Sequence, residues 1–344
     1  MKKFSSFRSA NNSQFNGLLN SGDPCRRLSL LDSRFWPWGL FEKLVVTFTV
    51  CLLSISNALN AESIVKFKEI NGCLIVVPLR IDGKGPHNFI IDTGSDDTAI
   101  DLDLVKELGV SPTSSVTLVT AAGSQEVQTG YPLRNVQLGS RVIPEVKALA
   151  MNLEALKPYK IRGIMGQSLL SRFNYFLDYK RHEMTIEENN ELSGRLVGNS
   201  RVLSFQKSEG RWMVRVPRET GPGLKMVLDA GANELVMYDC ENLGLDIDNG
   251  SLHTVQVATN LGTRELHAAR LRHFDVGGIA LRNLTVVLAK NGTGDEARPE
   301  DGLLPARLFN AVYFDNTRKQ VVFNPEFSRT VQVAGKSKGC LRGN

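Results

Sequence analysis

One short motif occurs twice in this chain of 344 residues, 137 positions apart. The first copy is the apolar run at residues 89–91 followed by D-T-G-S at 92–95. The second is the apolar run at residues 226–228 followed by D-A-G-A at 229–232. Each copy is typical of a buried strand that ends in a carboxylate and a tight glycine turn. Because burying a carboxylate carries a desolvation cost, two such placements indicate a paired-carboxylate site.

Other landmarks repeat in the same order, with offsets of 135 to 139 residues. So many features would not recur in the same order at nearly the same offset by chance, so the chain is predicted to be an internal duplication. Its many short strands and glycine-rich turns predict a mostly β fold. The paired landmarks are the helix patterns closed by Gly109 and Gly244, the hairpin turns at 121–124 and 260–263, the strands at 136–140 and 274–278, the segments 163–166 and 302–305, a short helix at 169–173 in the first copy, and the closing strands within 176–187 and 314–324.

The repeat divides the chain into four parts. We expect a leader at residues 1–61, a first lobe at 62–195, a second lobe at 201–328 and a tail at 329–344. The polar stretch 188–200 is the expected joint between the lobes. Each lobe has the size of an ordinary small domain.

The leader contains an apolar run from Leu44 to Ile55, followed by small residues of the kind that signal peptidase accepts. The run is shorter than the roughly 20 apolar residues of a membrane span. The sequence therefore predicts a cleaved signal peptide, with an N-terminal membrane tether through residues 44–61 as the alternative. In either case the protein is expected to be exported, to the periplasm or beyond the cell, or anchored at the membrane.

Charge and cysteine content limit the partners, disulfides and cofactors that can be expected. Most of the formal charge of +5 belongs to the leader, so a nucleic-acid partner is not expected. Beyond the leader the cysteines are Cys73, which falls in a strand pattern and is expected in the core, and Cys240 and Cys340, which could form one bridge. No C-x-x-C or H-x-x-x-H spacing occurs, so neither a metal nor a cofactor is predicted.

Paired carboxylates have a definite chemistry. Two Asp side chains about 3 Å apart share one proton and titrate as a pair. The ionised member can take a proton from a water that attacks a peptide carbonyl, and the protonated member can donate to the developing oxyanion or the leaving nitrogen. A glycine after each Asp lets backbone N–H groups approach the carboxylate. A hairpin over the site would exclude water and bind the substrate as an added strand.

Residues 89–95, together with the apolar-apolar-Gly segment at 163–166, resemble the retropepsin-like aspartic proteases, in the bacterial single-chain tandem form related in plan to pepsin. The resemblance covers about residues 64–328. It implies a mostly β fold of two tandem β-barrel lobes related by a pseudo-twofold axis, with short helices. It further implies that Asp92 and Asp229 meet at the lobe interface as the catalytic pair.

The resemblance also implies roles for the surrounding residues. Ser95 would hydrogen-bond the outer oxygen of Asp92, and the segment Ile164-Met165-Gly166 would lie beside the Asp92 loop. Two flap hairpins, at residues 119–126 and 258–265, would cover the substrate. The supporting loop residues would be Thr93, Gly94, Ser95, Ala230, Gly231 and Gly166, and the flap tips would be Ala121, Ala122, Gly123, Asn260, Leu261 and Gly262.

The second copy departs from the family pattern. Ala230 and Ala232 stand where hydroxyl residues are common, so Thr93 would lack a hydroxyl partner across the interface, at a cost of about 1 kcal/mol or more. Pro305 replaces the usual glycine of the second apolar-apolar-Gly segment, and neither flap tip carries a tyrosine. The second lobe is thus the more degenerate copy.

Three hypotheses follow. The first is an exported aspartic endopeptidase, a monomer with pseudo-dimeric lobes that uses Asp92 and Asp229 on a peptide or protein substrate. The second is a homodimer whose working pair is Asp92 from each chain. The third is a non-catalytic pseudoprotease that binds extended peptides or serves as an envelope scaffold.

Overall fold

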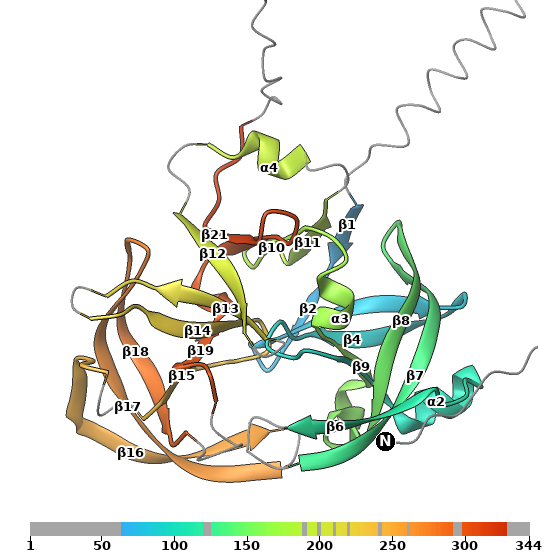
Figure 1. Cartoon of the computed structure of the whole chain (residues 1–344), viewed down its shortest axis with the longest axis horizontal. Helices are drawn as coiled ribbons and strands as arrows, with labels where there is room; N and C mark the ends of the chain where they lie inside the picture. Colours follow the sequence, from blue (N-terminus) through green and yellow to red (C-terminus); the bar gives the residue numbers. More distant parts are fainter. Residues whose placement is uncertain are drawn as a thin grey trace, which may run out of the picture. The chain divides into compact units, whose positions relative to one another are not determined.

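The computed structural model describes nine stretches of the chain (Figure 1), which are residues 63–119, 125–187, 191–197, 201–208, 211–218, 221–239, 243–259, 262–291 and 298–328. Strands dominate them, as predicted. The leader, the tips of both hairpins, Cys240, Cys340 and the tail lie outside these residues, and so do the predictions made for them. Among the helices within them, none is long and apolar enough to span a bilayer.

The first lobe is an eight-stranded sheet. A pairing of β3 with β7 through Arg80 and Gln137 closes six of its strands into a barrel. The two remaining strands, β2 and β6, extend the sheet at its ends. In sheet order the strands are β2 (Lys68–Ile70), β3 (Leu74–Ile81), β4 (Lys84–Ile91), β9 (Ile161–Met165), β5 (Thr98–Asp101), β8 (Arg141–Met151), β7 (Gln125–Leu138) and β6 (Ser114–Val119).

The second lobe repeats this order strand for strand, which confirms the duplication. Among the described strands, the extra pairing that closes a barrel occurs only in the first lobe. The equivalent strands, in sheet order, are β12 (Arg201–Ser208), β13 (Arg211–Val216), β14 (Leu224–Asp229), β19 (Gly302–Pro305), β15 (Leu235–Tyr238), β18 (Ile279–Ala289), β17 (Gly262–Val276) and β16 (Ile247–Thr259).

A central sheet joins the lobes. Its order is β1 (Ser63–Lys66), β11 (Glu183–Ile186), β10 (Tyr175–Asp178), β20 (Ala311–Asp315) and β21 (Gln320–Phe323), and it continues into β12. In the antiparallel pairing of β10 with β20, Phe176 lies opposite Tyr313. These two residues are 137 positions apart, the offset of the repeat, so each faces its own equivalent. The pseudo-twofold axis therefore passes through this pair.

The helices are short. The helix predicted at 101–109 is confirmed as α2 (Leu102–Leu108), which ends at Gly109 in the left-handed conformation, with φ of 71°. The helix predicted at 169–173 is wrong in its bounds, since α3 spans Gln167–Leu170. The second-copy helix before Gly244 falls largely on residues outside the described part. The remaining short helices are η1 (Glu154–Tyr159), α4 (Glu191–Arg195) and η4 (Ala306–Leu308).

Two further local expectations are corrected by the structure. Cys73 is not a core strand residue, because β3 begins one residue later; it lies half-buried in the preceding turn, with Sγ 3.6 Å from the Ile70 carbonyl oxygen. The strand and turn predicted at 136–140 and at 274–278 are present, but the strands are not separate elements, since they are the last residues of β7 and β17. A long strand that stays paired along its length contains no turn, so the sequence has no turn signal that would divide it in two.

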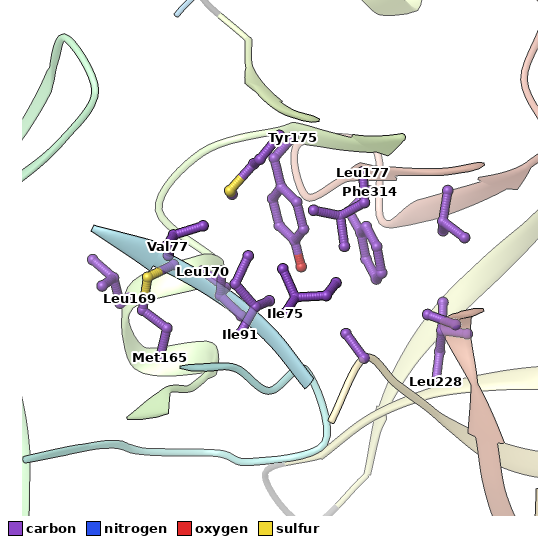
Figure 2. Close-up of a cluster of buried hydrophobic side chains, with 14 of the residues drawn as sticks. Ile75, Val77, Ile91, Met165, Leu169, Leu170, Tyr175, Leu177, Leu228 and Phe314 are labelled. Carbon is purple, nitrogen blue, oxygen red and sulfur yellow. The ribbon is translucent and has the colours of Figure 1, made fainter. Parts of the chain in front are cut away.

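One hydrophobic core contains side chains of both lobes, and Figure 2 shows part of it. Ile91 and Leu228, the residues directly before the two Asp residues, both belong to it and are almost fully buried. Tyr175 of the first lobe stacks on Phe314 of the second, with ring centroids 4.6 Å apart. Burial of each such side chain stabilises the fold by about 1.5–3 kcal/mol. The strand ends that carry the two Asp residues are therefore anchored in one apolar core, to which both copies contribute.

Candidate active site

The two Asp residues come from equivalent strand ends. Asp92 directly follows β4, and Asp229 is the last residue of β14. A methyl group placed on Gly231 would lie 3.2 Å from Oδ1 of Asp92 and 3.2 Å from Oδ1 of Asp229. One placed on Gly94 would lie 2.7 Å from Oδ2 of Asp229. The carboxylates therefore flank a single point at the lobe interface, and both glycines are needed for their close approach.

Asp92 accepts hydrogen bonds at both oxygens. The N–H groups of Gly94 and Ser95 donate to Oδ1 at 3.0 and 3.1 Å, and the Ser95 hydroxyl donates to Oδ2 at 2.7 Å. Because Oδ1 is the oxygen nearer Gly231, Ser95 holds the oxygen that faces away from the second lobe. Three donors thus fix the orientation of the Asp92 carboxyl group.

Asp229 lies in a different environment. It is only 9% exposed, and its Oδ1 accepts from the Gly231 N–H at 2.7 Å. Burial raises the pKa of the Asp229 carboxyl well above its usual range, and the charge of Asp92 and a hydrogen bond to that side chain raise it further. The N–H groups of Gly231 and Ala232 act in the opposite direction. Burial and the neighbouring carboxylate thus both disfavour the ionised form of Asp229.

Thr93 joins the lobes below the carboxylates. Its side chain is 2% exposed; its hydroxyl donates to the Leu228 carbonyl at 2.6 Å and accepts from the Ala230 N–H at 2.9 Å. Ala230 offers Thr93 no hydroxyl partner, as expected, but the Thr93 hydroxyl is nevertheless satisfied by backbone groups of the second copy. The hydroxyl bonds to the backbone of the second copy, which is the same whatever side chain stands at 230.

The segment that ends in Gly166 lies against the Asp92 loop. Met165 pairs with Ile91, and its carbonyl accepts from the Asp92 N–H at 3.0 Å. A methyl group on Gly166 would come within 2.2 Å of the Asp97 carbonyl oxygen. Only glycine allows the loop to approach this closely, which accounts for the motif in physical terms.

In the second lobe, Pro305 occupies the place of Gly166. Pro305 lies opposite Asp229 in the parallel pairing of β14 with β19 and precedes η4. Its φ of −63° suits proline. In the first lobe the backbone N–H groups after Gly166 donate to carbonyls of the Asp92 loop, whereas in the second the Arg307 guanidinium donates to the Asn233 side-chain oxygen.

The structure describes the strands of both flap hairpins, but only one of the predicted tip residues. Strands β6 with β7 and β16 with β17 form the two antiparallel hairpins that were predicted, and Gly262 is the first residue of β17. The other tip residues lie outside the described part of the chain. Within the described part, no three His, Cys, Asp or Glu side chains gather in the manner of a metal site.

Sequence reasoning missed one residue of the site. Gln167 follows Gly166 directly, and its side-chain amide donates to the Thr93 carbonyl at 2.8 Å. The available signal was the polar Gln167 between Gly166 and the apolar pair Leu169 and Leu170. A carboxamide in a short buried helix needs a hydrogen-bond partner, and this need points to a specific contact.

A mostly β fold of two lobes with the same strand order, whose Asp-Thr-Gly and Asp-Ala-Gly turns meet at the lobe interface, defines a class of pepsin-like and retropepsin-like proteins. A family model described as Aspartyl protease matches the chain twice, over residues 77–170 and 215–306. The chain therefore belongs to this family, with two tandem retropepsin-like domains. A comparison with curated proteins finds no match.

Proposed function

We propose that this protein is an exported aspartic endopeptidase that hydrolyses peptide bonds with a water molecule activated by Asp92 and Asp229. The observation that carries the proposal is the approach of both carboxylates to one point beside Gly231. The family supports a peptidase at the general level. Export rests on the apolar run in the leader and on nothing in the folded part.

The unlike environments of the two carboxylates suggest their roles. Asp92, with its three donors, is the general base that takes a proton from the water. Asp229, which is buried and carries a raised pKa, is the acid that donates to the carbonyl oxygen as the tetrahedral intermediate forms. As the C–N bond breaks, Asp92 gives its proton to the leaving nitrogen and Asp229 takes back a proton from a hydroxyl of the collapsing diol, so the pair returns to its starting state.

The same geometry favours a single-chain pair over a homodimer. Asp92 already has Asp229 as its neighbour within the chain, and Thr93 already bonds to the second copy. A homodimer that joined two Asp92 residues would have to break these contacts. We therefore propose a monomer whose substrate is an extended peptide or protein segment.

The test uses the full chain and a diverse peptide mixture between pH 3 and pH 7, with products identified by mass spectrometry. Asp92→Asn and Asp229→Asn should each lower cleavage by about a hundredfold or more. Asp103→Asn on the exposed face of α2 is the matched control and should cleave normally.

Cleavage that survives Asp229→Asn but not Asp92→Asn would overturn the single-chain pair and favour the homodimer. Absence of cleavage from a folded protein at every pH would overturn the peptidase proposal and favour a peptide-binding role.

A further inference from the structure

Gln167 is the first residue of α3 and lies directly under the Asp92 loop. Its side chain is 8% exposed. Its amide nitrogen Nε2 donates to the Thr93 carbonyl at 2.8 Å, and its backbone N–H donates to the Ser95 carbonyl at 2.8 Å. One residue thus holds two carbonyls of the loop that carries Asp92.

The Thr93 carbonyl has a special place in that loop. It shares a planar peptide unit with the N–H of Gly94, and this N–H donates to Oδ1 of Asp92 at 3.0 Å. Fixing the carbonyl direction therefore fixes the N–H direction on the other side of the same plane. Hydrogen bonds that act in series through a peptide also polarise one another, so the bond from Gln167 strengthens the donor that reaches Asp92.

The second lobe lacks this arrangement. The residue that follows Pro305 is Ala306, which is buried and has no side-chain donor. The carbonyl of Ala230, the equivalent of Thr93, therefore receives no such bond from the residue at this place in the repeat. The two carboxylates consequently differ beneath their loops as well as at their own oxygens.

We propose that Gln167 is a positioning residue that orients the Thr93–Gly94 peptide and thereby holds the Gly94 N–H on Oδ1 of Asp92. This inference rests on the proposed function for its catalytic meaning. Gln167 itself touches neither the reacting atoms nor the substrate, and it acts only through the peptide that it holds.

The main variant is Gln167→Met, which keeps the length of the side chain and removes the donor. The acidic limb of the pH dependence of kcat/KM should move upward by about 0.5–1 pH unit, because the ionised form of Asp92 loses part of its stabilisation. At a fixed acidic pH, kcat should fall about three- to tenfold, in line with that shift. KM should stay within about twofold, because Gln167 lies beneath the loop.

The control is Asn316→Ala at the opposite end of the same helix. Asn316 donates through Nδ2 to the carbonyls of Leu170 and Phe173, so its removal also loosens α3. It should lower the melting temperature and leave the acidic limb where it is. A merely structural role for Gln167 predicts the same behaviour in both variants.

A direct titration separates this inference from the proposed function. The Asp92 carboxyl carbon can be followed by NMR against pH in the wild type and in Gln167→Met, whether or not the protein cleaves peptides. An upward shift of the Asp92 titration in the variant supports the inference even if no cleavage is found. Identical titrations and identical acidic limbs overturn it.

Should Gln167→Met fail to fold, Gln167→Asn takes its place. Its shorter carboxamide keeps a donor at a greater reach from Thr93, so a smaller shift in the same direction is expected. A titration unchanged in this variant, with the Gly94 amide proton resonance also unchanged, would count against the inference.

Discussion

The two lobes share a strand order but hold their carboxylates differently. The first lobe surrounds Asp92 with side-chain support from Ser95 and Gln167. The second has Ala232 and Ala306 at the equivalent places, so Asp229 depends on backbone donors and on burial. A pair that shares one proton works when its two environments push the pKa values apart. The smaller number of polar side chains around Asp229 therefore agrees with the paired-carboxylate chemistry that we propose.

The brace between the lobes shows the same asymmetry. Thr93 reaches across to backbone groups of the second copy, and Ala230 offers no hydroxyl in return. One hydroxyl satisfies one carbonyl and one N–H. This brace at the Asp turns is thus supplied by the first copy alone, and three measurements test the asymmetry.

The largest effect is expected from Thr93→Val, which keeps the shape and removes the hydroxyl. The Leu228 carbonyl and the Ala230 N–H would both be left buried without this partner, at a cost of about 2–4 kcal/mol. The melting temperature should fall by roughly 5–15 °C, as measured by calorimetry. Thr185→Val, at a buried threonine of β11, is the control and should cost clearly less. Equal losses in the two variants would refute a special role for Thr93.

The next effect concerns pH. Because the pKa of Asp229 is raised, the folded protein keeps a proton that the unfolded chain loses, so stability falls as pH rises above the ordinary Asp range. Asp229→Asn removes this titration, and its side-chain oxygen can still accept from Gly231. The variant should be more stable than the wild type at pH 7, by about 1.4 kcal/mol for each unit of elevation, and equally stable near pH 3.

The control for this experiment has the opposite sign. Hydrogen bonds from Lys157 and Lys106 lower the pKa of Asp103, so Asp103→Asn should lose stability at pH 7 and converge on the wild type in acid. Melting temperatures from pH 3 to pH 8 give both curves. If the Asp229→Asn curve runs parallel to the wild type, the carboxyl is not protonated in the folded state as we infer.

The smallest effect is expected from Ala230→Thr, which would return a hydroxyl to the second copy. A reciprocal bond to the first lobe should stabilise the protein by about 0.5–1 kcal/mol. The site is tight, since Ala230 is 1% exposed, and a clear fall in melting temperature would show that the pseudo-symmetric space has been lost. Ala150→Thr, in the core of the first lobe, has no reciprocal partner and should destabilise.

The sequence was most informative where structure is local. The Asp-Gly turns, the glycine that ends α2 and the register of the repeat all follow from neighbouring residues, and each predicts an element of the fold. The family pattern added the meeting of Asp92 with Asp229. These features could be predicted because the same local signals occur twice at one offset.

The remainder depends on partners far along the chain. The backbone partners of Thr93 lie 135 and 137 residues away, and nothing near Thr93 indicates them. Gln167 finds its carbonyl 74 residues away. Helix α4 forms in a polar joint because Leu192 packs on Tyr313 and Val322 of the central sheet. Such contacts exist only after the fold has brought distant segments together.

The register of the central sheet also sets an order of events during synthesis. Tyr175 pairs with Phe314, which the ribosome adds 139 residues later. At about 5–20 residues per second this interval is roughly 7–28 s, during which β10 has no β20 to pair with. Contacts of such separation also form slowly in the finished chain. The central sheet is therefore among the last parts to assemble, and β10 stays without its β20 neighbour until the closing strands of the second copy have been made.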